Sequence, residues 1–386
     1  SKDCDAPDMN SHTLRIPPHL LPADGRFGSG PSKVRSAQVA AVADSGATVL
    51  GTSHRKPPVK NLIAQIREGL AELFALPAGY EVVLGLGGAT AFWDAAAFGL
   101  VRRRAAAYVY GEFTRKFAAA LQRAPWLDDP QLIDSPAGTA PTLTQTPQAD
   151  AVCWAQNETS TGAMVKVARP QPGTDQLVLV DATSAAGGLP VDVSATDAYY
   201  FSPQKCFGAD GGLWVSLLSP AAVDRIERIS RSDRYIPAFL DLQTAVDNSR
   251  KNQTYNTPPI AALLLLAAQI EWMNAAGGLA AMTKRTQHSA DILYSWAENR
   301  PETSPFVSDP AARSHTVGTI DIDTDIDSRL LIDTLRANGI RDIDPYRKLG
   351  RNQIRVGMFP AVEPADIAKL TACIDYVLDS GCVAAQ

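Results

Sequence analysis

The alternation of extended and helical patterns along this chain constrains its fold more than any other feature. Apolar runs of strand length recur at 81–86, 105–110, 151–155, 177–181, 198–201 and 213–217. Segments with apolar residues at helical spacing lie between or before them, at 57–74, 90–101 and 112–123. Strands that alternate with helices predict an α/β fold whose sheet is mostly parallel and flanked by helices.

The second half of the chain predicts a separate, smaller unit. A helix over 258–275 is apolar nearly all round in its first half, which predicts burial in the protein or at a subunit interface. Gly277 and Gly278 break that helix and mark a boundary. The following patterns indicate helices at 279–299, 327–338 and 364–380 and strands at 316–322 and 353–359. We therefore expect a loose tail over 1–25, a large domain over 26–276 and a small α+β domain over 277–386.

Composition excludes several classes of partner. The 386 residues carry a net charge of −5, and the longest basic block is Arg102-Arg103-Arg104, so we expect neither nucleic acid nor membrane as a partner. The five cysteines at 4, 153, 206, 373 and 382 show no zinc spacing. They predict free thiols in a reducing compartment and no metal site. The start of the chain has no apolar core like that of a signal peptide, so we expect a cytoplasmic protein.

A lysine and an aspartate follow two of the predicted strands. Lys205 lies just beyond the run Ala198-Tyr199-Tyr200-Phe201, and Asp181 ends the run Leu177-Val178-Leu179-Val180. An acid and a lysine at adjacent strand ends suit pyridoxal phosphate, because the lysine forms the Schiff base and the acid keeps the pyridine nitrogen protonated. The alternative is a strand-end lysine whose charged end simply reaches water.

Three further segments suit the same cofactor, although each has an ordinary structural explanation. Gly85-Leu86-Gly87-Gly88-Ala89-Thr90 stands between a strand and a helix, where backbone N–H groups can hold a phosphate. Asn157-Glu158-Thr159 follows a strand and offers short polar groups, or is only a turn. Phe113 either stacks on the cofactor ring or belongs to the core.

An ordered set of motifs resembles one family. These motifs are Arg26-Phe27-Gly28-Ser29-Gly30-Pro31, Thr52-Ser53-His54-Arg55, Gly87-Gly88-Ala89-Thr90, Asn157-Glu158-Thr159, Asp181-Ala182-Thr183-Ser184, Gln204-Lys205 and Tyr255-Asn256-Thr257-Pro258-Pro259. Together they closely resemble the phosphoserine aminotransferases, of the class V branch of fold-type-I pyridoxal-phosphate enzymes, over about residues 26 to 360. The variant with Phe113 in place of tryptophan resembles the actinobacterial branch.

The resemblance implies a role for each matching residue. Lys205 would be the catalytic Schiff-base lysine and Asp181 the partner of the pyridine nitrogen. Ala89, Thr90 and Gln204 would hold the cofactor phosphate, Thr159 the ring oxygen, and Phe113 the ring face. Asn256 and Thr257 would complete the phosphate site of the other subunit of a homodimer. His54, Arg55 and Arg355 would bind the anionic substrates, which the family's activity identifies as glutamate and 3-phosphohydroxypyruvate.

Some alternatives remain open at this point. Arg347, Lys348 and Arg351 crowd the segment before Arg355, and the sequence does not decide which of them meets a substrate phosphate. An alanine–glyoxylate or serine–glyoxylate aminotransferase differs only in its substrate-binding residues. A cysteine desulfurase would need a mobile cysteine, and Cys206 and Cys373 are poorly placed for that role. A non-catalytic regulator that binds the cofactor is a further class, but no DNA-binding module or basic arm precedes residue 26.

Overall fold

A seven-stranded sheet forms the centre of the computed structural model, which describes residue 4 and residues 14–386. The strand order is β1-β9-β8-β7-β4-β2-β3. Their bounds are Glu81–Leu86 (β1), Ala105–Val109 (β2), Gln131–Asp134 (β3), Ala151–Ala155 (β4), Leu177–Asp181 (β7), Ala198–Phe201 (β8) and Leu213–Leu218 (β9). Strand β9 is antiparallel to both of its neighbours, whereas the other pairs are parallel, so β9 alone runs against the rest. The predicted α/β fold with a mostly parallel sheet is confirmed.

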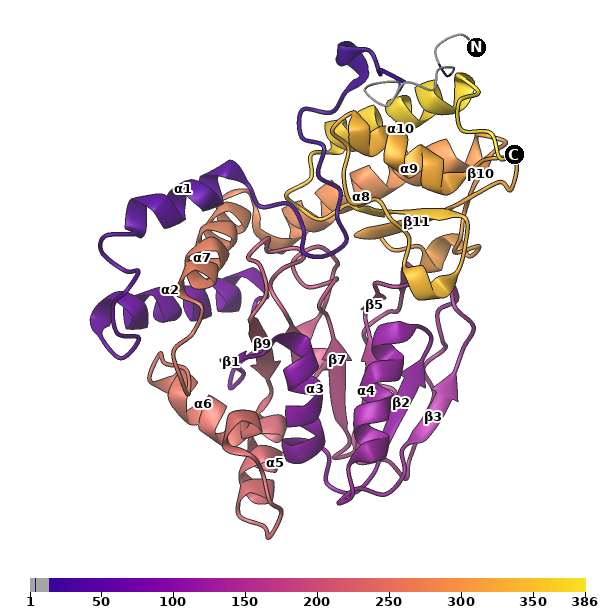
Figure 1. Cartoon of the computed structure of the whole chain (residues 1–386). Helices are drawn as coiled ribbons and strands as arrows, with labels where there is room; N and C mark the ends of the chain where they lie inside the picture. Colours follow the sequence, from indigo (N-terminus) through magenta and orange to yellow (C-terminus); the bar gives the residue numbers. More distant parts are fainter. Residues whose placement is uncertain (1–3, 5–13) are drawn as a thin grey trace.

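Helices cover both faces of this sheet, as Figure 1 shows. Along β7, Val178 and Val180 join the apolar cluster that includes α2 (Pro57–Leu73) and α7 (Ile260–Ala275). Leu177 and Leu179 point to the opposite face and join the cluster of α3 (Gly88–Gly99), α4 (Glu112–Arg123), α5 (Pro220–Ser230) and α6 (Leu242–Arg250). A strand buried on both faces is apolar at every position, which is why these strands appear as continuous apolar runs in the sequence.

A second, three-stranded sheet packs with the C-terminal helices above the large sheet in Figure 1. Its order is β10-β11-β12, with bounds Thr303–Pro305, Val317–Ile322 and Gln353–Gly357. Helices α8 (Gly278–Glu298), α9 (Ser328–Ala337) and α10 (Pro364–Asp379) share a separate apolar cluster with it. The domain boundaries proposed above stay a prediction.

In the described part of the chain, no single helix is both long and apolar enough to cross a membrane. Helices α7 and α8 pass that test only as a pair bent by 90°.

The described part of the N-terminal segment is not loose, which corrects the expectation for residues 14–25. Leu14 and Ile16 are buried in the same cluster as the C-terminal helices. The side chain of Asn338 holds both of them, because its Oδ1 accepts from the Ile16 N–H at 3.0 Å and its Nδ2 donates to the Leu14 carbonyl at 2.8 Å. The rest of the expected tail, residues 1–3 and 5–13, lies outside the described residues.

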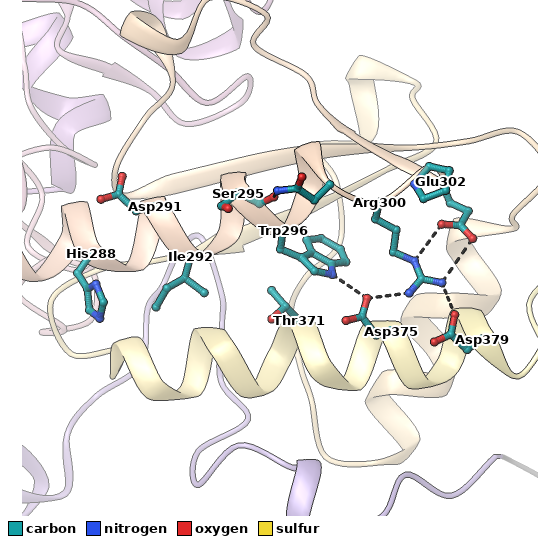
Figure 2. A pocket seen from close by; sticks show the side chains of 12 residues that line it. His288, Asp291, Ile292, Ser295, Trp296, Arg300, Glu302, Thr371, Asp375 and Asp379 are labelled. Carbon is teal, nitrogen blue, oxygen red and sulfur yellow. Dashed lines mark hydrogen bonds and ion pairs between the residues drawn. The ribbon is translucent and has the colours of Figure 1, made fainter.

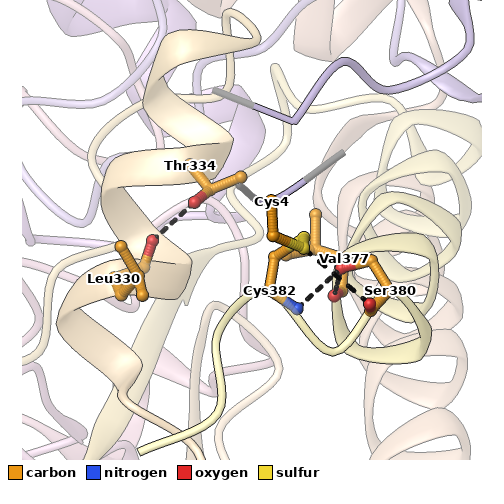
Figure 3. Close-up of a disulfide and its surroundings, with 6 residues drawn as sticks. All are labelled: Cys4, Leu330, Thr334, Val377, Ser380 and Cys382. Carbon is orange, nitrogen blue, oxygen red and sulfur yellow. Dashed lines mark hydrogen bonds between the residues drawn. A yellow bond between two sulfur atoms is a disulfide. The ribbon is translucent and has the colours of Figure 1, made fainter. Parts of the chain in front are cut away.

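The expectation of five free cysteines is wrong for two of them. Cys4 and Cys382 form a disulfide near the end of α10 (Figure 3), with their Cα atoms 5.3 Å apart. That separation lies within the usual range for a disulfide. Ser380 supports the turn, since its hydroxyl accepts from the Cys382 N–H at 3.1 Å. Because the two cysteines are 378 residues apart, sequence spacing could not indicate that they meet.

Several short elements were not expected from the sequence. Strand β3 lies inside the polar stretch 125–149, where only alternate residues are partly covered. Helix α1 (Ser36–Ser45) and helices α5 and α6 are also additions, as is a small hairpin of β5 (Asn157–Glu158) and β6 (Ala163–Met164).

Candidate active site

The carboxyl ends of the parallel strands meet at one edge of the large sheet and surround a cavity of about 270 Å³. Ligands of open α/β sheets characteristically bind at this edge. Seven residues predicted from the sequence line the cavity: Ala89, Thr90, Phe113, Thr159, Asp181, Gln204 and Lys205. They come from five different strand-to-helix or strand-to-loop connections, which the sheet brings together.

Lys205 reaches the cavity from the loop after β8. Its Nζ donates to the carbonyl oxygen of Ser29, a residue of the N-terminal segment. Burial, and then the charge of Arg355, lower the pKa of Lys205 from 10.5 to about 8, although Asp181 opposes that shift. About one tenth of the amines are therefore neutral at pH 7, against fewer than one in a thousand at the ordinary lysine pKa, and the neutral amine is the form that reacts with a carbonyl.

Asp181 ends β7 with its carboxylate almost fully buried. Its Oδ1 accepts from the Thr183 N–H at 3.0 Å, and its Oδ2 accepts from the indole Nε1–H of Trp93 at 3.1 Å. Burial raises the pKa of Asp181, while these donors and the charge of Lys205 lower it in part. A carboxylate held in this way suits a cationic ring nitrogen.

Helix α3 presents a free N-terminus to the cavity. Its N-cap, Gly87, has a φ of 99°, a conformation that glycine adopts without strain, and no side chain caps the helix. The first N–H groups of α3, at Gly88, Ala89 and Thr90, are thus available to an anion, which the helix dipole also favours.

The Asn157-Glu158-Thr159 segment organises the opposite side of the cavity. The Thr159 hydroxyl and the Asn157 side-chain amide both donate to the hydroxyl of Ser184 at 2.8 Å. Glu158 is fully buried and accepts from the backbone N–H groups of Phe113 and Thr114 at 3.2 and 3.0 Å. Glu158 thereby holds the start of α4, and with it the aromatic ring of Phe113, at the cavity wall.

Orphaned polar atoms show that the cavity suits a polar ligand. Among the described residues, three buried side-chain oxygens that line it have no hydrogen-bond partner: Asn157 Oδ1, Thr183 Oγ1 and Gln204 Oε1. Buried polar atoms without a partner are costly, so such a group of them at one cavity indicates ligand contacts. A lysine, a buried acid, an aromatic wall and a free helix N-terminus together fit pyridoxal phosphate.

Arg355 lies beside this cavity on β12. Its Nη1 donates to the carbonyl of Thr159 at 3.1 Å, and its guanidinium carbon stands 5.7 Å from the centre of the Tyr346 ring. Its Nε is buried without a partner among the described residues. Burial lowers the pKa of Arg355. One edge of the guanidinium is therefore available for a carboxylate, which a planar fork binds in a bidentate manner.

Four other predicted site residues do not line the cavity of their own chain. His54 is buried with its Nδ1 3.5 Å from the Thr257 hydroxyl. Arg55 is exposed and donates to Gln253 Oε1 at 2.5 Å and to the carbonyl of Tyr255 at 3.2 Å. Asn256 and Thr257 are exposed on the same segment.

These four residues, His54, Arg55, Asn256 and Thr257, therefore form a second group, separate from the one around Lys205.

Two of the three basic residues before Arg355 are engaged elsewhere, and two cysteines are buried away from the cavity. Arg351 pairs with Asp321 at 2.8 Å, and Lys348 pairs with Glu112 at 3.2 Å. Cys206 and Cys373 are buried, with the pKa of each thiol raised by burial, and neither lines the cavity. A reactive cysteine needs an accessible thiolate, so neither suits a desulfurase.

A second cavity, of about 1010 Å³, lies between α8 and α10 (Figure 2). It shares no lining residue with the cavity around Lys205. Its main cation, Arg300, is paired with Glu302, Asp375 and Asp379 at 2.9, 2.9 and 2.5 Å. Trp296 Nε1 donates to the same Asp375 at 2.8 Å. Because these charges satisfy one another, the group is an ion-pair network that joins two helices.

Trp93 and Glu158 are among the residues at the site that were not assigned a role from the sequence. Trp93 was missed, although it follows Ala89 by four residues and so lies on the same face of α3. Glu158 was quoted only as part of a motif, and its contact with α4 depends on two segments 44 residues apart.

Comparison with known proteins agrees with this geometry. The family model of class-V aminotransferases matches residues 30–341. The phosphoserine aminotransferase of Corynebacterium glutamicum is 58% identical over 366 residues, which cover 95% of this chain and 97% of that protein. The one from Nocardioides sp. is 56% identical over 369 residues, covering 95% and 98%.

Solved structures show the same fold at low identity. A phosphoserine aminotransferase from Cytophaga hutchinsonii superposes with a TM-score of 0.83 at 23% identity, covering 92% of this chain and 99% of that one. A pyridoxamine–pyruvate aminotransferase from Mesorhizobium loti has a TM-score of 0.82 at 17% identity, covering 95% and 94%. The family match and the identity to curated relatives lead to one conclusion: this chain belongs to the class-V aminotransferases and, within them, to the phosphoserine aminotransferase family.

Proposed function

We propose that this chain is a pyridoxal-phosphate-dependent phosphoserine transaminase, which transfers the amino group of L-glutamate to 3-phosphohydroxypyruvate. The products are O-phospho-L-serine and 2-oxoglutarate, as serine biosynthesis requires. The observation that carries the proposal is the cavity at the sheet edge, where Lys205 and Asp181 face each other beside a free helix N-terminus and Arg355.

Each residue of the cavity has a definite task in this proposal. The cofactor, when bound, supplies an electron sink for the pair of electrons released at the substrate Cα. Lys205 would hold the cofactor, and its Nζ is the group that would carry a proton to and from the substrate. Asp181 keeps the ring nitrogen protonated. The N–H groups and hydroxyl of Ala89 and Thr90, with Gln204, hold the phosphate.

The remaining contacts orient the ring and the substrate. Thr159 would bind the ring oxygen by turning its hydroxyl from Ser184 toward it, and Phe113 would cover the ring face. Arg355 would bind the substrate carboxylate, for which its Nε is free. A bidentate arginine–carboxylate pair fixes the direction of the substrate as well as its position.

A coupled assay tests this function. Purified protein is supplied with glutamate and 3-phosphohydroxypyruvate, beside parallel reactions with pyruvate and glyoxylate as amino acceptors. We expect the phosphorylated acceptor to give by far the highest kcat/KM. A preference for pyruvate or glyoxylate would instead assign the chain to the alanine–glyoxylate or serine–glyoxylate type. The phosphorylated hydroxythreonine of pyridoxine biosynthesis is a second substrate that the same assay examines.

We further propose that the enzyme is a homodimer whose two active sites are shared. The buried His54 and the exposed Arg55, Asn256 and Thr257 form one group that does not line the cavity of its own chain. In a two-fold symmetric dimer the same surface meets itself, so a group at the interface of one subunit can complete the site of the other. Asn256 and Thr257 would then contact the cofactor phosphate of the partner, and His54 and Arg55 its substrate.

Subunit exchange distinguishes a shared site from an isolated one. Lys205→Ala and the double variant Asn256→Ala, Thr257→Ala are each prepared nearly inactive and then mixed. In a shared arrangement, each mixed dimer has one site with both defects and one intact site. Random exchange should therefore restore about one quarter of the sites. Exchange proven by mass spectrometry without any recovery of activity would rule the sharing out.

We also propose a cytoplasmic location. Cys153, Cys206 and Cys373 are free and buried, as is usual for a protein of a reducing compartment. The Cys4–Cys382 disulfide is unusual for such a compartment. Alkylation of the protein in freshly broken cells, followed by mass spectrometry, measures whether these two thiols are oxidised there, and cell fractionation tests the location itself.

A further inference from the structure

Asp181 poses a physical problem, because it must stay ionised in a place that disfavours charge. The carboxylate is almost fully buried, and burial raises its pKa. A protonated Asp181 would lose the charge that attracts a cationic ring nitrogen. Hydrogen-bond donors to the carboxylate favour its charged form, so they determine the pH range over which Asp181 stays ionised.

Trp93 is one of the donors to Asp181 that the described residues provide. Its indole Nε1 lies 3.1 Å from Asp181 Oδ2, while the Thr183 N–H occupies Oδ1. Only 5% of Trp93 is exposed, and its ring stacks on Phe117 of helix α4 with the planes 20° apart. Packing between α3 and α4 thus fixes the direction of the indole N–H.

We propose that Trp93 is a positioning residue of this active site: its indole N–H holds the Asp181 carboxylate ionised and oriented toward the ring nitrogen of the cofactor. The inference rests on the proposed function, since it concerns the residue that would bind pyridoxal phosphate. Trp93 acts through Asp181 and needs no contact with the reacting atoms.

Three other titratable groups face Asp181 from neighbouring elements. Lys205 lies after β8, Tyr200 on β8, and Tyr110 at the end of β2. Burial raises the pKa of both phenols well above their ordinary value, so they stay neutral while carboxylates titrate. Lys205 titrates near pH 8, on the alkaline side. The phenols therefore do not contribute to the acid side of a pH profile. Lys205 and the buried Glu158, whose pKa burial also raises, titrate in every variant, so a difference between variants on that side reports on Asp181.

The experiment measures pyridoxal phosphate binding without measuring turnover. Apoprotein is titrated with pyridoxal phosphate between about pH 5 and 9, and the absorbance of the bound cofactor gives the affinity at each pH. Trp93→Phe removes the N–H but keeps an aromatic ring. Trp126→Phe is the matched control, because its Nε1 donates at 2.9 Å to the carbonyl of Ala97 and its ring stacks on Phe98 in the same layer.

Cofactor affinity should fall toward low pH, and we call this part of the profile the acid limb. In Trp93→Phe the acid limb should move to higher pH by about one unit or more. A hydrogen bond to a charged acceptor changes the proton affinity of that acceptor by roughly tenfold or more. Trp126→Phe should keep the parent limb. Trp93→His should largely restore it, because its Nε2 takes the place of the indole nitrogen in the five-membered ring. If the Phe variant does not fold, Trp93→His is compared with Trp93→Met, which lacks a donor.

The outcomes separate this inference from the proposed function. A parent protein that fails to bind pyridoxal phosphate would contradict the function itself. A parent that binds it, with the same acid limb in Trp93→Phe and Trp126→Phe, would overturn only the role of Trp93. A limb shifted equally in Trp93→His and Trp93→Phe would also overturn it, because loss of packing and not of the N–H would then be the cause.

Discussion

Replacing Arg355 by alanine should reduce kcat/KM far more than replacing a neighbouring arginine. In the structure the guanidinium of Arg355 is mostly covered and donates once, from Nη1 to the Thr159 carbonyl at 3.1 Å. Its buried Nε has no partner among the described residues, so the desolvation of that donor is uncompensated until an anion arrives. A substrate carboxylate can accept from the free edge of the fork in two hydrogen bonds.

The size of the effect follows from this geometry. Truncating one partner of a desolvated, hydrogen-bonded charge pair costs about 2–5 kcal/mol. At 1.4 kcal/mol for each factor of ten, kcat/KM should fall by roughly 30- to 4,000-fold. Arg355→Lys keeps the charge but not the planar fork, so its loss should lie between those of the parent and the alanine variant.

Arg351→Ala provides the control for this measurement. Arg351 is half-exposed and pairs with Asp321 at 2.8 Å, and a surface ion pair contributes about 0–1 kcal/mol, or less than about fivefold. Both variants are assayed with glutamate and 3-phosphohydroxypyruvate after their cofactor content has been shown to equal that of the parent. If Arg355→Ala changed kcat/KM no more than Arg351→Ala, our assignment of the substrate carboxylate to Arg355 would be refuted.

Three further predictions concern other parts of the molecule. Capture of pyridoxal phosphate by apoprotein should accelerate as the pH rises through about 8, because burial lowers the pKa of Lys205 to about 8 and the neutral amine is the nucleophile. Stopped-flow absorbance measures the rate at each pH. A midpoint near 10.5, the ordinary lysine value, would contradict the prediction. Gly30→Ala should slow covalent capture, since a Cβ there would displace the end of the Lys205 side chain, whereas Gly173→Ala, at another positive φ with open space around it, should leave the rate of capture unchanged. Cys4→Ser should lower the free energy of unfolding by about 2–4 kcal/mol by removing the cross-link to Cys382, as denaturant titration under oxidising conditions measures; equal stability would argue against the cross-link.

Most of the large sheet could be predicted because its strands are locally distinctive. Strands β2, β4 and β7 are buried on both faces, so the sequence of each is a short, continuous apolar run. Strand β3 lacks that pattern because it lies at the edge of the sheet, where only alternate side chains are partly buried. Helix α5 did carry a local signal that was overlooked: the hydroxyl of Ser219 accepts from the Ala222 N–H at 3.0 Å, and Pro220 opens the helix.

The cavity residues were predictable for a related reason. Asp181 ends a strand, and Lys205 and Thr90 each lie four residues after one; parallel strands deliver such positions to one edge of the sheet. The local sequence therefore determined which residue types would meet, once the strands were placed in parallel. Packing then set the lowered pKa of Lys205, which depends on burial and on Arg355, a residue 150 positions away.

Only the tertiary structure decided the contacts between segments that are distant in the sequence. It placed Trp93 on Asp181, kept Arg55 and Asn256 away from the cavity of their own chain, and joined Cys4 to Cys382. The amino-acid sequence by itself determined the strands, the helices and the chemical groups at their ends, because those depend on neighbours within a few residues. Which distant groups then touch depends on strand order and helix packing, which are properties of the whole folded chain.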